Sequence, residues 1–135
     1  MIRVIMGLKG SGKTKKLIDS IHETLEHASG DVVCIEYGKH LTYDVNYKVR
    51  LVDSKEYAIS NPDLLKGFLS GLHAGNFDIT HVFIDNLYKT IGNDRAAGEE
   101  FILWCAKFAE ANYMDITITV SDDAEAASEE IKKYL

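Results

Sequence analysis

Eight residues near the start of the chain have the types and spacing needed to bind phosphate. Residues 7–14 read GLKGSGKT, which is the pattern G-x-x-x-x-G-K-T. Glycines allow such a loop to wrap so that successive backbone N–H groups converge on an anion. Lys13 is then expected to act on the β- and γ-phosphates, and the Thr14 hydroxyl to ligate Mg²⁺. The predicted phosphate-binding residues are Gly7, Lys9, Gly10, Ser11, Gly12, Lys13 and Thr14.

An acidic residue later in the chain complements this loop. Residues 81–85 read HVFID, an apolar run that ends in Asp85. An aspartate at the end of a strand holds the metal's ligand shell in many nucleotide sites. We therefore predict Thr14 and Asp85 as the magnesium contacts. The alternative is that Asp85 caps the turn after its strand.

The residue after Asp85 bears on hydrolysis. It is Asn86, and an amide can orient a group but cannot accept a proton as a general base. Either a base lies elsewhere or bound nucleotide turns over slowly. Glu36 is the candidate base, because it follows the second apolar run and open α/β sheets present ligand contacts at the carboxyl ends of strands. The alternative for Glu36 is a solvated residue at a strand end.

Strands and helices alternate around these residues. Apolar runs predict five strands, at residues 2–6, 32–37, 47–52, 80–85 and 116–120. Helices are predicted at residues 14–25, from Asn61–Pro62 to Gly75–Asn76, at 96–112, and from a Ser121–Asp123 cap to Leu135. This alternation indicates a mainly parallel sheet between helical layers, a three-layer α/β/α fold forming a single domain over residues 1–135.

Composition limits the class of protein. The chain has 135 residues, 46% of them apolar and 27% charged, as expected for one soluble globular domain. No apolar run approaches the roughly 20 residues of a membrane span. The first strand directly follows Met1, which leaves no room for a signal peptide. Cys34 and Cys105 lie in apolar segments, which suits buried thiols of a cytoplasmic protein. The net charge of −6 does not favour nucleic acid as a ligand.

The combined pattern resembles the P-loop NTPase superfamily, and within it the RecA-like branch. The resemblance is carried by residues 2–28, 32–37 and 82–86. It implies ATP with Mg²⁺ as the ligand and Glu36 as the catalytic base. It also implies a central strand before the loop, with the fifth strand between that strand and the Asp85 strand. The N-K-x-D motif of G proteins is absent, so ATP is favoured over GTP.

Residues 7–21 are also similar to the P-loop and first helix of type II thymidine kinases, and Thr42–Tyr43 to part of their next loop. Those kinases carry Asp-Glu where this chain has Asp85–Asn86. They also carry a zinc-bound lasso beyond the position of Leu135. The resemblance therefore implies a shared core more than a shared kinase activity.

Three functions remain open from the sequence. The leading one is Mg²⁺-dependent binding of ATP with slow hydrolysis. The alternatives are an ATP-binding regulatory or adaptor protein with an unknown protein partner, and a small-molecule kinase. The helix at 96–112 and the residue after it carry more large apolar residues than one buried stripe needs, which predicts a homo-oligomer.

Arg95, Ser121 and a group of tyrosines each have two interpretations. Arg95 is predicted in a loop with two glycines, where it acts as an arginine finger or is simply solvated. Ser121 either senses the γ-phosphate or caps the last helix. The tyrosines at 37, 43, 47 and 57 either stack on a base or pack at the sheet edge.

Overall fold

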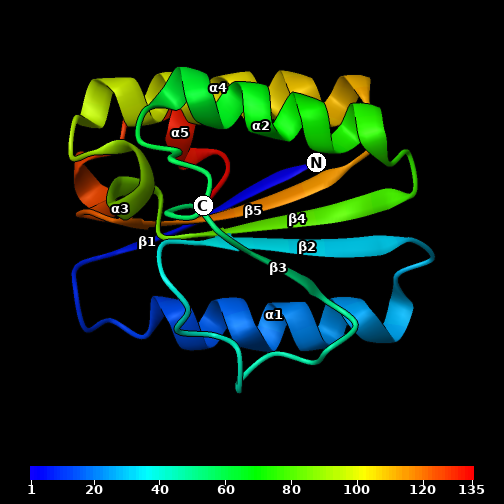
Figure 1. The fold of residues 1–135 in the computed structure, drawn as a ribbon. Helices are drawn as coiled ribbons and strands as arrows, with labels where there is room; N and C mark the ends of the chain where they lie inside the picture. The colour runs from blue at the N-terminus through cyan, green and yellow to red at the C-terminus, as the bar shows by residue number, and fades with distance from the viewer.

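The computed structural model describes all 135 residues as a three-layer α/β/α domain (Figure 1). The strands are β1 (Ile2–Gly7), β2 (Asp31–Glu36), β3 (Arg50–Asp53), β4 (Ile79–Asp85) and β5 (Asp115–Ser121). The helices are α1 (Lys13–His27), α2 (Pro62–Gly75), α3 (Leu87–Ile91), α4 (Arg95–Ala111) and α5 (Glu129–Lys132), with a 3₁₀ turn at Ala124–Ala126. The predicted fold class is confirmed.

The sheet has five strands in the order β1-β5-β4-β2-β3, and every pairing is parallel. As expected, β5 lies between β1 and the Asp85 strand. The expectation of a central β1 is wrong, because β1 forms an edge of the sheet. The C-terminal segment covers that edge, where the Val4 amide donates to the Tyr134 carbonyl at 2.9 Å. This hydrogen bond satisfies a backbone amide of the edge strand that would otherwise pair with a neighbouring strand.

The direction of the crossovers decides which helices cover which face. The connection from β1 to β2 crosses the sheet one way and carries α1 on one face (Figure 1). The connections from β3 to β4 and from β4 to β5 return the other way and carry α2 and α4 on the opposite face. This reversal follows from the right-handedness of parallel crossovers. The carboxyl ends of β1, β5 and β4 are consequently neighbours.

A long connection on the α1 side corrects one predicted strand. Leu41, Val45 and Val49 are buried in a small core with Leu17 and Ile21 of α1. The apolar positions near residue 47 therefore pack against a helix, and β3 begins only at residue 50. β3 forms the other edge of the sheet.

The helices differ from prediction mainly after β4 and β5. The sequence did not predict α3, which has five residues. The predicted last helix is wrong, because β5 continues to Ser121, a 3₁₀ turn follows and α5 has only four residues. The Asn61 cap is confirmed, since its side chain accepts from the Leu64 amide at 2.9 Å.

Most of the large apolar side chains of α4 pack inside the molecule. Ile102 is buried, and Trp104 and Phe108 stack with ring centroids 4.8 Å apart. Phe108 also contacts His73 of α2 edge-on, at 6.1 Å between centroids. The helix thus packs against both the sheet and α2, which explains its broad apolar face without a second copy of the chain.

Candidate functional site

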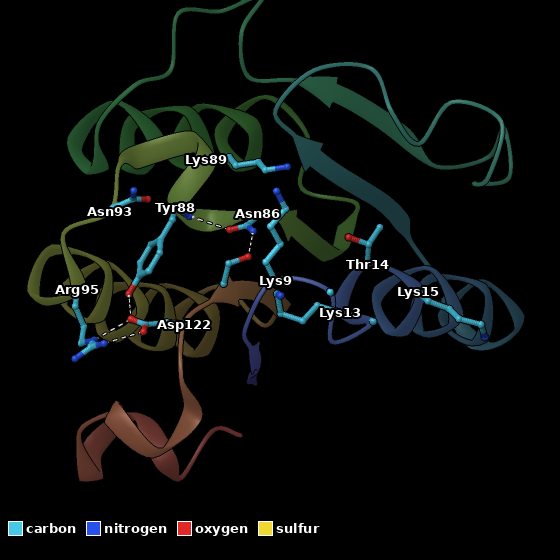
Figure 2. A pocket seen from close by; sticks show the side chains of 13 residues that line it. Lys9, Lys13, Thr14, Lys15, Asn86, Tyr88, Lys89, Asn93, Arg95 and Asp122 are labelled. Atoms are coloured by element: carbon cyan, nitrogen blue, oxygen red, sulfur yellow. Dashed lines mark hydrogen bonds and ion pairs between the residues drawn. The ribbon is translucent and has the colours of Figure 1, made fainter.

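A pocket of about 930 Å³ lies where the carboxyl ends of β4 and β5 meet the loop after β1 (Figure 2). Its size is within the range of small-molecule sites, roughly 300–1,000 Å³. Its wall is polar and mainly cationic, although the whole chain carries a net charge of −6. The lining residues are Lys9, Gly10, Gly12, Lys13, Thr14, Lys15, Asn86, Tyr88, Lys89, Asn93, Arg95, Ser121 and Asp122.

The loop of residues 7–14, called the glycine loop below, forms one wall. Gly10 and Gly12 have φ of 87° and 82°, which a residue with a side chain rarely adopts. Gly12 is the N-cap of α1, so the loop delivers the chain directly to a helix N-terminus. Unpaired backbone N–H groups and the positive end of the helix dipole therefore face the pocket.

Lys13 lies across this loop. Its side-chain nitrogen donates to the Leu8 carbonyl at 3.1 Å, and the residue is only 7% exposed. Burial lowers the pKa of Lys13, while the nearby Asp85 carboxylate raises it. A desolvated ammonium attracts an anion more strongly than a solvated one does. By contrast, Lys15 also borders the pocket, but its side chain extends along α1 and pairs with Asp19 (Figure 2).

The two predicted metal contacts, Thr14 and Asp85, lie next to each other. The Thr14 hydroxyl lies 3.3 Å from Asp85 Oδ2, although the two residues are far apart in sequence. The Thr119 hydroxyl donates to the other oxygen, Oδ1, at 2.6 Å. A hydroxyl beside a carboxylate suits Mg²⁺, which prefers oxygen ligands and retains water. No group of three His, Cys, Asp or Glu side chains is placed to hold a metal, so water and phosphate oxygens would complete the shell.

Asn86 has both ends of its amide engaged. Its oxygen accepts from the Tyr88 amide at 3.1 Å and caps α3, while its nitrogen donates to the Ser121 hydroxyl. Ser121 thus lies on the pocket wall at the end of β5 and does not cap a helix. The alternative in which Ser121 caps the last helix is therefore wrong, while γ-phosphate sensing stays a prediction.

A hydrogen-bonded group of three side chains forms the far wall of the pocket (Figure 2). Arg95 donates two bonds of 2.8 Å to Asp122, and the Tyr88 hydroxyl donates a third at 2.7 Å. The Arg95 bond holds the pKa of Asp122 well below its ordinary value. Burial, together with the Asp122 charge, raises the pKa of Tyr88 to about 12. Arg95 is the first residue of α4 and is ion-paired, so the prediction of a free loop arginine is wrong.

Glu36 lies beside this pocket and does not line it. It pairs in register with Asp85 on the neighbouring strand and is only 3% exposed, so it is not a solvated strand end. Its Oε1 accepts from the backbone amides of His40 and Leu41, at 2.9 and 3.2 Å. Burial raises the pKa of Glu36. The carboxylate therefore stabilises the loop after β2 in this structure.

Sequence reasoning missed Thr119 and several residues of the far wall. Thr119 contacts Asp85 because β5 lies next to β4, as the family resemblance implied, and because the register of the two strands, which no motif specifies, sets these residues side by side. Tyr88 and Lys89 belong to the unpredicted α3. The tyrosines at 37, 43, 47 and 57 are exposed and lie outside the pocket.

Comparisons with protein families and with curated proteins identify no relative of this chain. No protein-family model matches the chain, and a search of curated proteins finds no match either. None of the helices combines the length and apolar character that crossing a membrane requires. The case for function therefore rests on the geometry of the pocket.

Proposed function

We propose that this protein binds a nucleoside triphosphate, ATP in the first instance, together with Mg²⁺, and hydrolyses it slowly. One observation carries the proposal: the glycine loop ends at the N-terminus of α1 with Lys13 across it and with Thr14 next to Asp85. Phosphate and a hard cation are the ligands that suit this combination. Such a protein would act in the cytoplasm, where buried thiols stay reduced.

Each element of the site has a distinct part in the proposal. The backbone of the glycine loop, with Lys9 and Ser11, surrounds the phosphates, and Lys13 neutralises their charge. Thr14 and Asp85 hold Mg²⁺ and its water. Lys89, on the opposite wall, adds positive charge to the same space. When bound, the metal would offset phosphate charge and orient the terminal phosphate.

Slow turnover is expected because the pocket lacks a free base. Asp122 is the only acid on its wall, and Arg95 and Tyr88 already bind it. Asn86 cannot accept a proton. Glu36 stays the proposed base, but it would reach the pocket only after giving up its contacts with the loop after β2. The same observation favours the second candidate, a regulatory protein in which ATP binding matters and turnover is incidental.

Calorimetry of ATP binding in the presence of Mg²⁺ tests the central claim. Lys13→Ala removes a charge-assisted contact, which is worth about 1.5–3 kcal/mol, so affinity should fall about 10- to 150-fold. Lys16→Ala is the matched control, because Lys16 is an exposed residue of the same helix that does not line the pocket. Equal affinity of Lys13→Ala and the wild type would contradict the proposal. Circular dichroism should show that both variants stay folded.

Single-turnover hydrolysis separates the two candidates. Glu36→Gln keeps the size of the side chain and removes its ability to take a proton. Loss of hydrolysis with unchanged ATP affinity would support Glu36 as a base and the protein as an enzyme. Unchanged slow hydrolysis would support incidental turnover in a regulatory protein.

A further inference from the structure

Thr119 is a buried polar residue beside the candidate metal contacts. It lies on β5, is 0% exposed, and its hydroxyl donates to Asp85 Oδ1 at 2.6 Å. The β4–β5 ladder pairs Ile84 with Ile118, so the residues one step further along, Asp85 and Thr119, lie side by side where the strands end. The register of two parallel strands thus produces this contact.

The hydrogen bond restricts the Asp85 carboxylate. An ionised carboxylate only accepts hydrogen bonds, so the threonine hydroxyl must be the donor. With Oδ1 fixed by Thr119, Oδ2 is the oxygen that lies 3.3 Å from the Thr14 hydroxyl. Rotation of the carboxylate would break a short bond in a half-buried position. Thr119 therefore selects which oxygen of Asp85 is directed toward the glycine loop.

We propose that Thr119 is a positioning residue that holds Asp85 in the orientation that binds Mg²⁺ and its water. This inference rests on the proposed function and names a residue outside the sequence motif. Outer-shell partners that orient metal ligands typically contribute 10- to 100-fold to metal affinity. Loss of the hydroxyl should therefore weaken the Mg²⁺ dependence of nucleotide binding and leave metal-free binding nearly unchanged.

The chain offers a matched control two residues earlier on the same strand. Thr117 is also buried, at 9% exposed, and its side chain makes no hydrogen bond within the protein. Residues two apart on a strand point to the same face of the sheet. Thr117→Val and Thr119→Val are thus the same chemical change at neighbouring buried sites, and only the second removes a contact with Asp85. Thr119→Ser keeps the hydroxyl.

The experiment measures the affinity for a fluorescent ATP analogue while Mg²⁺ is titrated, and again in excess chelator. Thr119→Val should raise the half-saturating Mg²⁺ concentration about 10- to 100-fold. Thr117→Val and Thr119→Ser should stay within about threefold of the wild type, and all variants should match it in chelator. If Thr119→Val does not fold, Thr119→Ala removes the hydroxyl without placing a methyl group against Asp85.

Two results would overturn the inference. One is a Thr119→Val protein with the Mg²⁺ dependence of the wild type. The other is an equal loss of affinity with and without Mg²⁺, which would make Thr119 a general structural residue. Failure of the proposed function looks different, because the wild type itself would then bind no nucleotide in the presence of Mg²⁺.

Discussion

Asn86 gives the sharpest test of how the pocket is built. Its oxygen caps α3 through the Tyr88 amide at 3.1 Å, and its nitrogen bonds to the Ser121 hydroxyl on β5. Asn86→Ala removes both bonds. We expect this variant to lose stability, because α3 is only five residues long and depends on its cap and on its attachment to β5.

The loss can be estimated from the two contacts. An Asn-to-Ala change at an N-cap costs about 1 kcal/mol, and a neutral hydrogen bond contributes about 1 kcal/mol. The sum is a loss of about 2 kcal/mol in the free energy of unfolding. With about 2.1 cal/mol/K of unfolding entropy per residue, a chain of 135 residues should melt about 7 °C lower.

Thermal unfolding followed by circular dichroism measures this loss, and Asn86→Asp is the matched control. Aspartate caps helices as well as asparagine does, and its carboxylate accepts a bond from the Ser121 hydroxyl. It should lose less than half as much stability as alanine. A carboxylate here would also stand on the pocket wall, where it could accept a proton. Asn86→Asp should therefore hydrolyse ATP at least about tenfold faster than the wild type, and Asn86→Ala should not.

Three outcomes would each refute a part of this reasoning. If alanine melts within about 1 °C of the wild type, Asn86 does not hold α3 against β5. If alanine and aspartate lose equal stability, the loss comes from something other than the cap. A stable Asn86→Asp protein with unchanged hydrolysis would show that a missing base is not what limits turnover.

Three further predictions follow from the same contacts. Asp85→Asn should weaken ATP binding in Mg²⁺ at least about tenfold and change metal-free binding little, and an equal loss in both conditions would identify Asp85 as a structural cap. The Arg95 bond lowers the pKa of Asp122, so the stability that this carboxylate contributes is complete above the unfolded pKa of about 4 and is lost at more acid pH. In Asp122→Asn, the free energy of unfolding, measured with urea at a series of pH values, should therefore fall less steeply below about pH 4. The same pH dependence in the variant and the wild type would contradict this. Because α4 uses most of its apolar face against the sheet and α2, light scattering with and without Mg²⁺ and ATP should show a monomer, and a homo-oligomer would show that a second copy covers the rest of that face.

Local motifs in the sequence predicted the glycine loop and its helix well. The spacing of Gly10, Gly12 and Lys13 specifies both the positive φ angles and the helix start that the structure shows. Apolar periodicity likewise located all five strands, although β3 began later than predicted. Asn61 and Pro62 marked the start of α2 for the same reason, since capping depends only on neighbouring residues.

Side-chain contacts between strands could not be predicted from local motifs, although the family resemblance implied the place of β5. Thr119 and Ser121 belong to the site only because β5 lies between β1 and β4. The pairing of Arg95 with Asp122 joins the start of α4 to the end of β5, which lie far apart in the sequence. Leu41 and Val45 gave no strand signal yet form the core against α1, because tertiary packing can bury a loop as well as a regular element.

The end of β5 offers one structural reason for both parts of the proposed function, nucleotide binding and slow turnover. Three side chains there hold the last residue of β4 and the segment after it, in sequence order: Thr119 bonds to Asp85, Ser121 to Asn86, and Asp122 to Tyr88. Each of these bonds fixes a group on or beside the pocket wall before any ligand arrives, which lowers the entropy lost on binding. The same bonds occupy Asn86 and Asp122, the wall residues best placed to orient or deprotonate water. The fixed ligand contacts and the slow turnover that we propose therefore share one structural cause.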